Sequence, residues 1–186
     1  IISSDDHEII DEAKKFGLKA HFVRPKEHSG DNIGDVPVLK HALIETEKKK
    51  NCIFDIVLML QPTAPLRTPS QIEKVIIEII SKNFETVWTV HKVDDKYHPD
   101  KQLKLNEKGN LEFFTKKGKD IISRQELSDS YMKNGIAYAI TRQFLIEKEQ
   151  ILGFKNGSVI LSGPIANIDT IDDLVYAEKI ISKNCK

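Results

Sequence analysis

The stretch Phe54–Gln71, FDIVLMLQPTAPLRTPSQ, decides the fold of this chain. It begins with Ile56–Leu60, a short apolar run that is typical of a strand buried on both faces. Pro62 and Pro65 then push the residues before them out of the helical region of backbone space. The segment after the strand is therefore predicted to be a stiff, extended loop.

A helix is predicted to begin directly after this loop. Thr68 is a suitable N-cap, Pro69 suits the first helical position, and Gln71 is spaced to complete a capping box. The apolar residues that follow recur at helical spacing and form one stripe: Ile72, Val75, Ile76, Ile79 and Ile80. A buried strand followed by an amphipathic helix is the repeating unit of α/β folds.

The loop between this strand and helix is a candidate binding wall. In open α/β sheets, ligands bind beyond the carboxyl ends of the strands, which is where this loop is expected to lie. It carries the amide of Gln61 and the guanidinium of Arg67. Proline-rich connections also occur where no ligand binds, so local physics alone leaves a purely structural reading open.

Strands and helices alternate through the first half of the chain, and together they predict one Rossmann-like, doubly wound, mostly parallel α/β sheet. The expected strands are Ile1–Ser3, Leu18–Val23, Ile56–Leu60 and Thr86–Val90, and the expected helices lie between Asp5 and Gly17, over Pro37–Lys49 and after Thr68.

The pattern changes at Asp94, and residues 94–130 are predicted to leave the core as a small β excursion containing a hairpin. The hairpin strands are Leu103–Leu105 and Leu111–Phe114. Alternation then resumes with a strand over Gly135–Thr141, a helix over Gln143–Glu149, a strand over Ser158–Leu161 and a helix capped by Thr170.

Composition excludes several classes of protein. A chain of 186 residues is expected to form a single domain, residues 1–186, and its 28 basic and 28 acidic residues favour neither nucleic acid nor an anionic membrane. No apolar run is long enough to span a bilayer, and Cys52 and Cys185 show no metal-ligand spacing, so we expect a cytoplasmic protein. The scattered histidines give no support to Ser–His or Cys–His catalysis.

Four segments carry a family resemblance. Residues 60–67, LQPTAPLR, are very similar to the LQPT-S-PLR segment of acylneuraminate cytidylyltransferases, which make CMP-sialic acid. Residues 124–138 resemble a second hallmark of that family, with the spacing RQxLxxxYxxNGxxY. Residues 167–174, NIDTIDDL, and residues 98–101, HPDK, resemble two further segments, and the four occur in the family's order.

The resemblance implies that CMP is transferred from CTP to an acidic nine-carbon sugar of the sialic or legionaminic type, with release of pyrophosphate. It implies that the sugar is bound by Gln61, Lys101, Arg124 and Tyr138, that the nucleotide is bound by Ser4, Arg24 and Asn134, and that Mg²⁺ is held by Asp169 and Asn167. It also implies a homodimer, with residues 94–130 reaching into the neighbouring subunit.

The residue types suit these roles. Only Arg24, Arg67, Arg124 and Arg142 are arginines, and scarce arginines are suited to planar recognition of carboxylate or phosphate. Nucleotidyl transfer relies mainly on positioning and on stabilising phosphate charge with cations.

Two departures from the family pattern stand out. No segment corresponds to the family's first strand and its glycine-rich, basic phosphate loop, so we expect this exact polypeptide to be inactive or nearly so. Asn167 also stands where the family carries its first metal-binding aspartate, which removes one unit of charge from the metal site. These departures support one alternative, a non-catalytic module that binds nucleotide or partners. A Kdo cytidylyltransferase, which shares the fold and chemistry, is a second alternative, over which residues 124–138 favour the sialic type.

Overall fold

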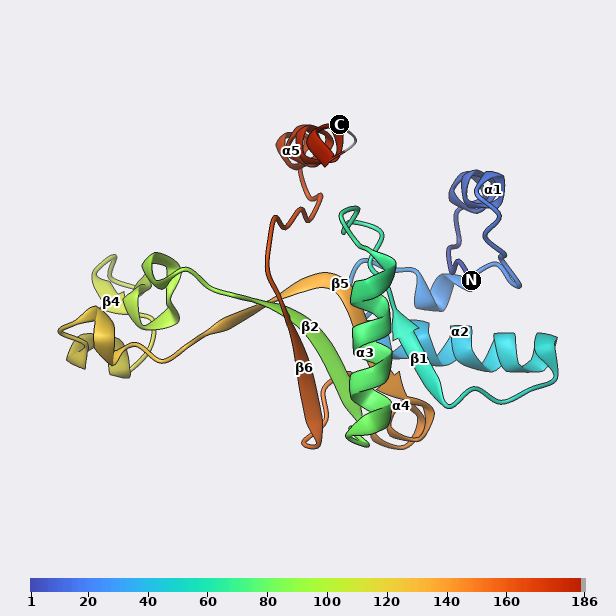
Figure 1. The fold of residues 1–186 in the computed structure, drawn as a ribbon, viewed down its shortest axis with the longest axis horizontal. Coiled ribbons are helices and arrows are strands. Elements are labelled where there is room, and N and C mark those ends of the chain that lie inside the picture. The colour runs from blue at the N-terminus through green and yellow to red at the C-terminus, as the bar shows by residue number, and fades with distance from the viewer. Residues whose placement is uncertain (185–186) are drawn as a thin grey trace.

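The computed structural model describes residues 1–184, so Cys185 lies outside the described residues. The helices are α1 (His7–Lys15), α2 (Asp35–Lys50), α3 (Pro69–Ser81), α4 (Arg142–Lys148) and α5 (Ile171–Asn184). The strands are β1 (Ile56–Met59), β2 (Thr86–Lys92), β3 (Leu103–Leu105), β4 (Leu111–Phe113), β5 (Tyr131–Thr141) and β6 (Asn156–Leu161). The α/β class and every predicted helix are therefore confirmed (Figure 1).

The local signals that predicted α3 are those that build it. The backbone N–H of Thr68 donates to the side-chain oxygen of Gln71 at 2.9 Å, which is one half of the capping box, and Pro69 occupies the first helical position. At α5 the backbone N–H of Thr170 donates to Asp173 at 2.8 Å in the same way. Both helix starts are thus fixed by residues three apart in sequence.

The main sheet is mixed, whereas the sequence predicted a mostly parallel one. Its strand order is β1-β5-β2-β6, in which β5 runs antiparallel to both β1 and β2, and only β2 and β6 pair in parallel. The reason lies in the connection between β2 and β5. The chain leaves the sheet after β2, forms the excursion and returns at the same edge, so β5 must enter in the opposite direction (Figure 1).

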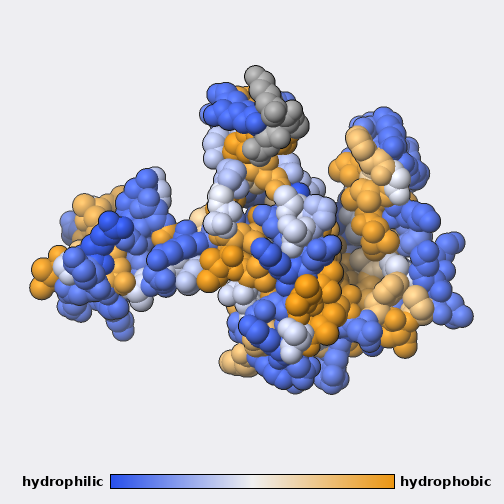
Figure 2. Space-filling model, viewed as in Figure 1, coloured by the Kyte–Doolittle hydropathy of each residue, from blue (hydrophilic) through white to orange (hydrophobic). Residues whose placement is uncertain are grey.

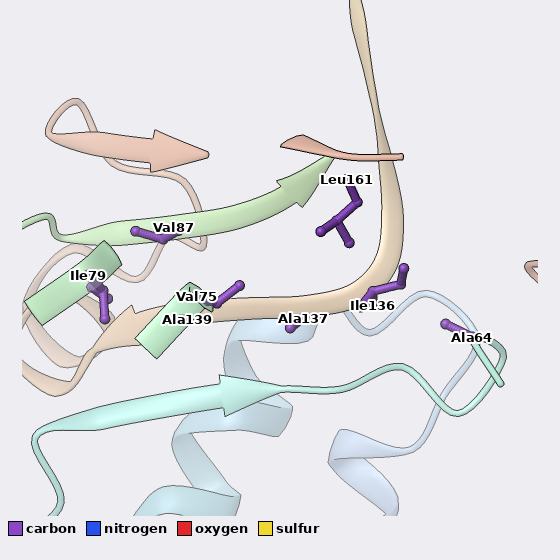
Figure 3. Close-up of a cluster of buried hydrophobic side chains, with 8 residues drawn as sticks. All are labelled: Ala64, Val75, Ile79, Val87, Ile136, Ala137, Ala139 and Leu161. Carbon is purple, nitrogen blue, oxygen red and sulfur yellow. The ribbon is translucent and has the colours of Figure 1, made fainter. Parts of the chain in front are cut away.

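Helices cover both faces of this sheet. On one face, α3 places Val75 and Ile79 against Val87, Ala137 and Ala139 of the central strands (Figure 3). On the other face, a second cluster joins α2, β5 and α4 through Leu43, Ile140, Phe144 and Leu145. The central strands are therefore buried on both sides, which explains why residues 136–140 of β5 form a continuous apolar run in the sequence.

The two strands predicted nearest the N-terminus are not formed. Residues 1–4 and 18–24 lie side by side and are joined by two backbone hydrogen bonds, from Ile2 N–H to Lys19 C=O at 3.0 Å and from Arg24 N–H to Ser4 C=O at 2.8 Å. Neither segment pairs with a strand of the main sheet within the described residues. Two isolated hydrogen bonds do not make a ladder, so the apolar pattern alone overestimated the strand content here.

Residues 94–130 project from the sheet as a separate arm (Figure 1). The predicted hairpin is confirmed, because β3 and β4 pair antiparallel with Leu105 opposite Leu111. The arm exposes many large apolar side chains: Tyr97, Leu103, Leu105, Leu111, Phe113, Phe114 and Ile122. Figure 2 shows hydrophobic, orange surface on this lobe at the left of the view.

None of the helices in the described part of the chain is long and apolar enough to cross a membrane.

Candidate functional site

Three segments far apart in the sequence meet beyond the carboxyl end of β1. The backbone N–H of Gln61 donates to the carbonyl of Gly135 at 3.3 Å, and the N–H of Ile168 donates to the carbonyl of Thr63 at 2.9 Å. The loop after β1, the start of β5 and the segment after β6 are therefore joined by backbone hydrogen bonds. This is the edge of the sheet at which the sequence predicted a binding wall.

A backbone kink at Gly135 shapes the centre of this edge. Gly135 has φ +71°, in the left-handed region that favours glycine, and the β2–β5 register breaks beside it, between Trp88 and Val90. A Cβ at Gly135 would lie 2.4 Å from Oε1 of Gln61 and 3.5 Å from Oδ1 of Asn167. The absence of a side chain therefore lets two polar side chains lie next to the kink.

Arg67 is not part of the binding wall. Its Nη2 donates to the carbonyls of Gln61 at 2.6 Å and Gly135 at 3.1 Å, and its Nε donates to the carbonyl of Ile136 at 2.5 Å. Burial lowers the pKa of Arg67 from its ordinary value. The guanidinium faces inward and ties the loop after β1 to the start of β5, which corrects the expectation that it faces a ligand.

Asn134, predicted to bind the nucleotide, is 3% exposed and its side chain is used within the protein. Its Oδ1 accepts hydrogen bonds from the Thr89 hydroxyl at 2.6 Å and from the backbone N–H of Ile136 at 3.1 Å. Its Nδ2 lies 2.8 Å from Nδ1 of His91. The Asn134 side chain is thus buried beneath the surface of this edge, where its hydrogen bonds support the kink at Gly135.

Tyr138, predicted to contact the sugar, is also buried, with 2% of its surface exposed. Its hydroxyl oxygen accepts a hydrogen bond from the backbone N–H of Gly135 at 2.7 Å. Its ring packs against Trp88 with centroids 4.7 Å apart, and burial raises the pKa of the phenol. Tyr138 therefore holds the backbone N–H of Gly135, whereas Asn134 holds that of Ile136, so the two side chains support the kink through different backbone groups.

Asn167 and Asp169 are exposed and lie in contact with each other. Nδ2 of Asn167 donates to the carboxylate of Asp169 at 2.9 Å, and its Oδ1 accepts from the hydroxyl of Thr63 at 2.8 Å. The nearby Asp173 is occupied differently: hydrogen bonds from Thr170 and from the backbone at Asp169 lower the pKa of its carboxyl group. The carboxylate of Asp169, unlike that of Asp173, therefore takes no part in capping a helix.

No hydrogen bond or ion pair among residues 1–184 joins the remaining predicted residues to this edge. Ser4 and Arg24 form a cluster near the N-terminus, in which the guanidinium of Arg24 lies 3.3 Å from Asp5 and the hydroxyl of Ser4 accepts from Asp6 N–H at 3.1 Å. Lys101 and Arg124 are both on the arm. Arg124 forms an ion pair with Asp95, and this pairing raises the pKa of the guanidinium.

Sequence reasoning missed three contributors to this edge. Thr63 holds the amide of Asn167, and Thr89 and His91 hold the amide of Asn134. A signal for the last two was present, because Thr89 and His91 alternate with apolar residues along β2 and thus share its inward face with Val87. A polar residue at an inward strand position requires a partner, but sequence alone does not identify that partner.

Comparison with curated proteins finds relatives that match nearly the whole of this chain and about three quarters of their own length. The chain is 32% identical to the pseudaminic acid cytidylyltransferase of Campylobacter jejuni serotype O:2, over 99% of this chain and 78% of that protein. The chain belongs to the nonulosonic acid cytidylyltransferase family. It is thus a member of a nucleotidyltransferase family, as residues 60–67 and 124–138 indicated.

A second relative is the CMP-N,N'-diacetyllegionaminic acid synthase of the same C. jejuni strain. This chain is 26% identical to it over 98% of this chain and 76% of the relative. Comparison with models of protein families finds no match.

Solved structures agree on the fold. A CMP:2-keto-3-deoxy-manno-octonic acid synthetase complexed with CTP superposes with a TM-score of 0.63 over 98% of this chain and 80% of that chain, at 16% identity. A putative glucose-1-phosphate thymidylyltransferase from Bacillus anthracis superposes with a TM-score of 0.54 over 93% of this chain and 70% of that chain, at 12% identity. At such identities the likeness concerns the fold alone, and it confirms the predicted nucleotidyltransferase type of α/β fold.

Proposed function

We propose that this protein transfers CMP from CTP to a nonulosonic acid of the pseudaminic or legionaminic type. The anomeric hydroxyl of the sugar attacks the α-phosphorus of CTP, the bond to the β-phosphate breaks, and pyrophosphate leaves. The observation that carries the proposal is the meeting of Gln61, the Gly135 kink and the Asn167–Asp169 pair at one sheet edge, in a chain 32% identical to a pseudaminic acid cytidylyltransferase.

Gln61 is the side chain best suited to contact the sugar. Its amide lies beside the kink and is half-buried, while its own backbone is held by Gly135 and Arg67. An amide offers both a donor and an acceptor for hydroxyl and N-acyl groups. Asn134 and Tyr138, being buried, act on the sugar and the nucleotide by fixing the kink that presents Gln61.

The donor chemistry at the Asn167–Asp169 pair fits Mg²⁺. Magnesium prefers oxygen ligands and binds through one or two carboxylates together with water and phosphate oxygens. No group of three or more His, Cys, Asp or Glu able to hold a metal occurs among residues 1–184, so the ion would depend on Asp169, the Asn167 amide oxygen and substrate phosphates. Thr63 can both donate and accept, so its hydroxyl would keep a partner if the Asn167 amide turned its oxygen towards the ion.

Replacing Asn167 with Asp is expected to tighten Mg²⁺ binding by roughly tenfold, because a second carboxylate restores one negative charge beside Asp169. Calorimetric titration of Mg²⁺ into the protein with bound CTP measures the change in Mg²⁺ affinity. N156D, at an amide whose Nδ2 donates to the carbonyl of Gly153 at 2.6 Å, adds the same charge elsewhere and is the control. Equal Mg²⁺ affinity in N167D and in the unmodified protein would contradict the proposed metal site.

We further propose that two copies of the chain associate through the arm, residues 94–130. The arm stands away from the sheet and exposes a large apolar surface, with Leu111 67% exposed and Leu105 68% exposed (Figures 1 and 2). Lys101 and Arg124 lie on this arm, apart from the edge that carries Gln61. Association in pairs would allow them to serve the sugar site of the neighbouring copy.

Leu111→Lys is expected to shift the protein from dimer towards monomer, because it places a charge in the apolar face of the hairpin. Sedimentation velocity over a range of concentrations measures the equilibrium. Ile77→Lys is the matched control, since Ile77 on α3 is 64% exposed and does not belong to the arm. A monomer for the unmodified protein, or an unchanged dimer for the Leu111 variant, would remove the arm from the proposal.

The experiment that tests the function measures binding of CTP and of a panel of acids: pseudaminic acid, legionaminic acid and Kdo. Pyrophosphate release is measured separately, because the lack of a recognisable phosphate loop in these residues predicts little or no turnover. Tighter binding of either nine-carbon acid than of Kdo is expected. A preference for Kdo would favour the alternative that this protein is a Kdo cytidylyltransferase, a reading compatible with the fold of the CMP:2-keto-3-deoxy-manno-octonic acid synthetase, which superposes with a TM-score of 0.63. Failure to bind CTP or any of the sugars would instead indicate an interaction module. The expected cytoplasmic location of this reaction remains a prediction.

A further inference from the structure

A buried polar network lies beneath the Gly135 kink, and the protonation state of its histidine decides how the network can be hydrogen-bonded. His91 is on β2 and is 6% exposed, and Thr89 on the same face is fully buried. Nδ1 of His91 lies 2.8 Å from Nδ2 of Asn134, while the Thr89 hydroxyl lies 2.6 Å from Oδ1 of Asn134. The network therefore connects the carboxyl end of β2 to the residue that precedes the kink.

The orientation of the Asn134 amide follows from the backbone. The N–H of Ile136 can only donate, and it lies 3.1 Å from one terminal atom of Asn134, so that atom must be the oxygen. The other terminal atom, which faces His91, is then the nitrogen. An amide nitrogen has hydrogens and no free lone pair to offer, so it must be the donor in this contact.

The orientation of Asn134 in turn fixes the state of His91. Because Nδ1 accepts a hydrogen bond, it carries no proton, and the neutral ring must carry its proton on Nε2. A protonated ring would oppose two donors across 2.8 Å and break the contact. Burial also lowers the pKa of His91, which favours the same neutral form.

The other ring nitrogen of His91 makes no hydrogen bond within residues 1–184 that would account for a histidine at this position. Nε2 of His91 is buried and has no hydrogen-bond partner among the described residues. A buried donor without a partner is unfavourable, whereas an apolar residue here would instead leave the buried Nδ2 of Asn134 without its acceptor. The histidine is therefore best explained by the hydrogen bond that its Nδ1 accepts.

We propose that His91, as the neutral Nε2-protonated tautomer, is a positioning residue that holds Asn134 and thereby the Gly135 kink that presents Gln61. Asn134 precedes the kink at Gly135, and its side-chain oxygen accepts a hydrogen bond from the N–H of Ile136, the residue after the kink. The carbonyl of Gly135 in turn accepts from the backbone N–H of Gln61. Hydrogen bonds, together with the backbone of residues 134–136, thus connect β2 to the loop that follows β1. The consequence for sugar binding rests on the proposed function, whereas the effect on the kink does not.

The first measurement determines the tautomer of His91 in the unmodified protein. Nitrogen-15 NMR of the imidazole rings distinguishes an unprotonated Nδ1 from a protonated one, and His91→Asn identifies the signals of His91 by their disappearance. The expected result at pH 7.5 is an unprotonated Nδ1 and a protonated Nε2. A ring protonated on Nδ1, or on both nitrogens, would overturn the inference.

The second measurement compares two replacements. His91→Asn places an amide oxygen near the position of Nδ1 and keeps an acceptor for Asn134, whereas His91→Leu removes it. We expect His91→Leu to shift the amide resonance of Gly135. We also expect it to weaken binding of the nine-carbon acid by about tenfold, because the loss of one hydrogen bond leaves Asn134 and the kink less firmly held. His91→Asn is expected to restore both, and His41→Leu, at a half-buried histidine on α2, is expected to change neither.

The outcomes separate the two proposals. If His91→Leu folds and leaves both the Gly135 resonance and sugar binding unchanged, His91 does not position the kink. If the unmodified protein binds no sugar acid, the proposed function fails, and the tautomer and the Gly135 resonance still decide the role of His91. If His91→Leu does not fold, the tautomer together with the His91→Asn variant decides it, since that variant must keep the Gly135 resonance in place.

Discussion

Gly135→Ala is expected to weaken binding of the acidic sugar by roughly ten- to a hundredfold while lowering the free energy of unfolding by only about 1–2 kcal/mol. The two effects have different origins. The modest loss of stability comes from forcing alanine to adopt φ +71°, which L-residues rarely adopt. The loss of binding comes from the new methyl group, which would lie 2.4 Å from Oε1 of Gln61.

The nature of the clash explains why binding is affected more than stability. The atom that the methyl group meets is the far end of a flexible side chain, so Gln61 can rotate away at little cost to the fold. Rotation removes its amide from the place where it can hydrogen-bond the sugar. Calorimetry with pseudaminic or legionaminic acid measures binding, and urea denaturation measures the free energy of unfolding.

Gly17→Ala is a matched control outside the arm, because Gly17 has φ +78° and a Cβ there would meet no atom within 4 Å. It carries the same backbone strain without the clash, so we expect a similar loss of stability with unchanged sugar affinity. Equal affinities for Gly135→Ala and the unmodified protein would show that Gln61 does not contact the sugar, and the proposed site would then need a different centre.

Arg67→Lys is expected to lower the free energy of unfolding by about 2–4 kcal/mol, since hydrogen bonds from a charged donor contribute roughly 1.5–3 kcal/mol each and lysine cannot reproduce the planar fork. The guanidinium donates to three carbonyls, those of Gln61, Gly135 and Ile136. A lysine ammonium would reach fewer of them and would bury a more strongly hydrated charge. Sugar affinity should fall as well, because the loop that carries Gln61 loses its attachment to β5.

Arg142→Lys controls for the loss of an arginine as such. Arg142 pairs bidentately with Glu47 at 2.8 and 3.1 Å, and its side chain is 34% exposed. Lysine retains the charge in a partly solvated pair, so the expected loss is about 0.5–1 kcal/mol with no change in sugar affinity. Urea denaturation of the two variants side by side measures both values. A smaller loss for Arg67→Lys than for Arg142→Lys would show that the three carbonyls do not depend on Arg67.

Much of the fold could be read from the sequence because its determinants are local. The N-caps Thr68 and Thr170 act on residues three positions ahead, and the apolar stripe of α3 repeats within a single helix. The hairpin of β3 and β4 is likewise closed by neighbouring residues. The edge that holds Gln61 and Asp169 could also be predicted, since both follow strands that run in the same direction.

The direction in which a side chain points was decided by tertiary structure. Arg67 was expected to face a ligand, yet its Nε donates to Ile136, 69 residues away, and faces inward. Asn134 was expected to contact nucleotide, yet Thr89 and His91, on a different strand, hold it beneath the edge.

The sequence by itself thus determined the class of fold, the family and the edge of the sheet that bears the site, because periodicity, capping and motif spacing act over a few residues. Only the tertiary structure decided which polar groups face that edge and which brace it, and that β5 enters the sheet against its neighbours. The physical reason is that a buried polar group must find a partner, and its partner comes from whichever distant strand the fold brings within hydrogen-bond distance.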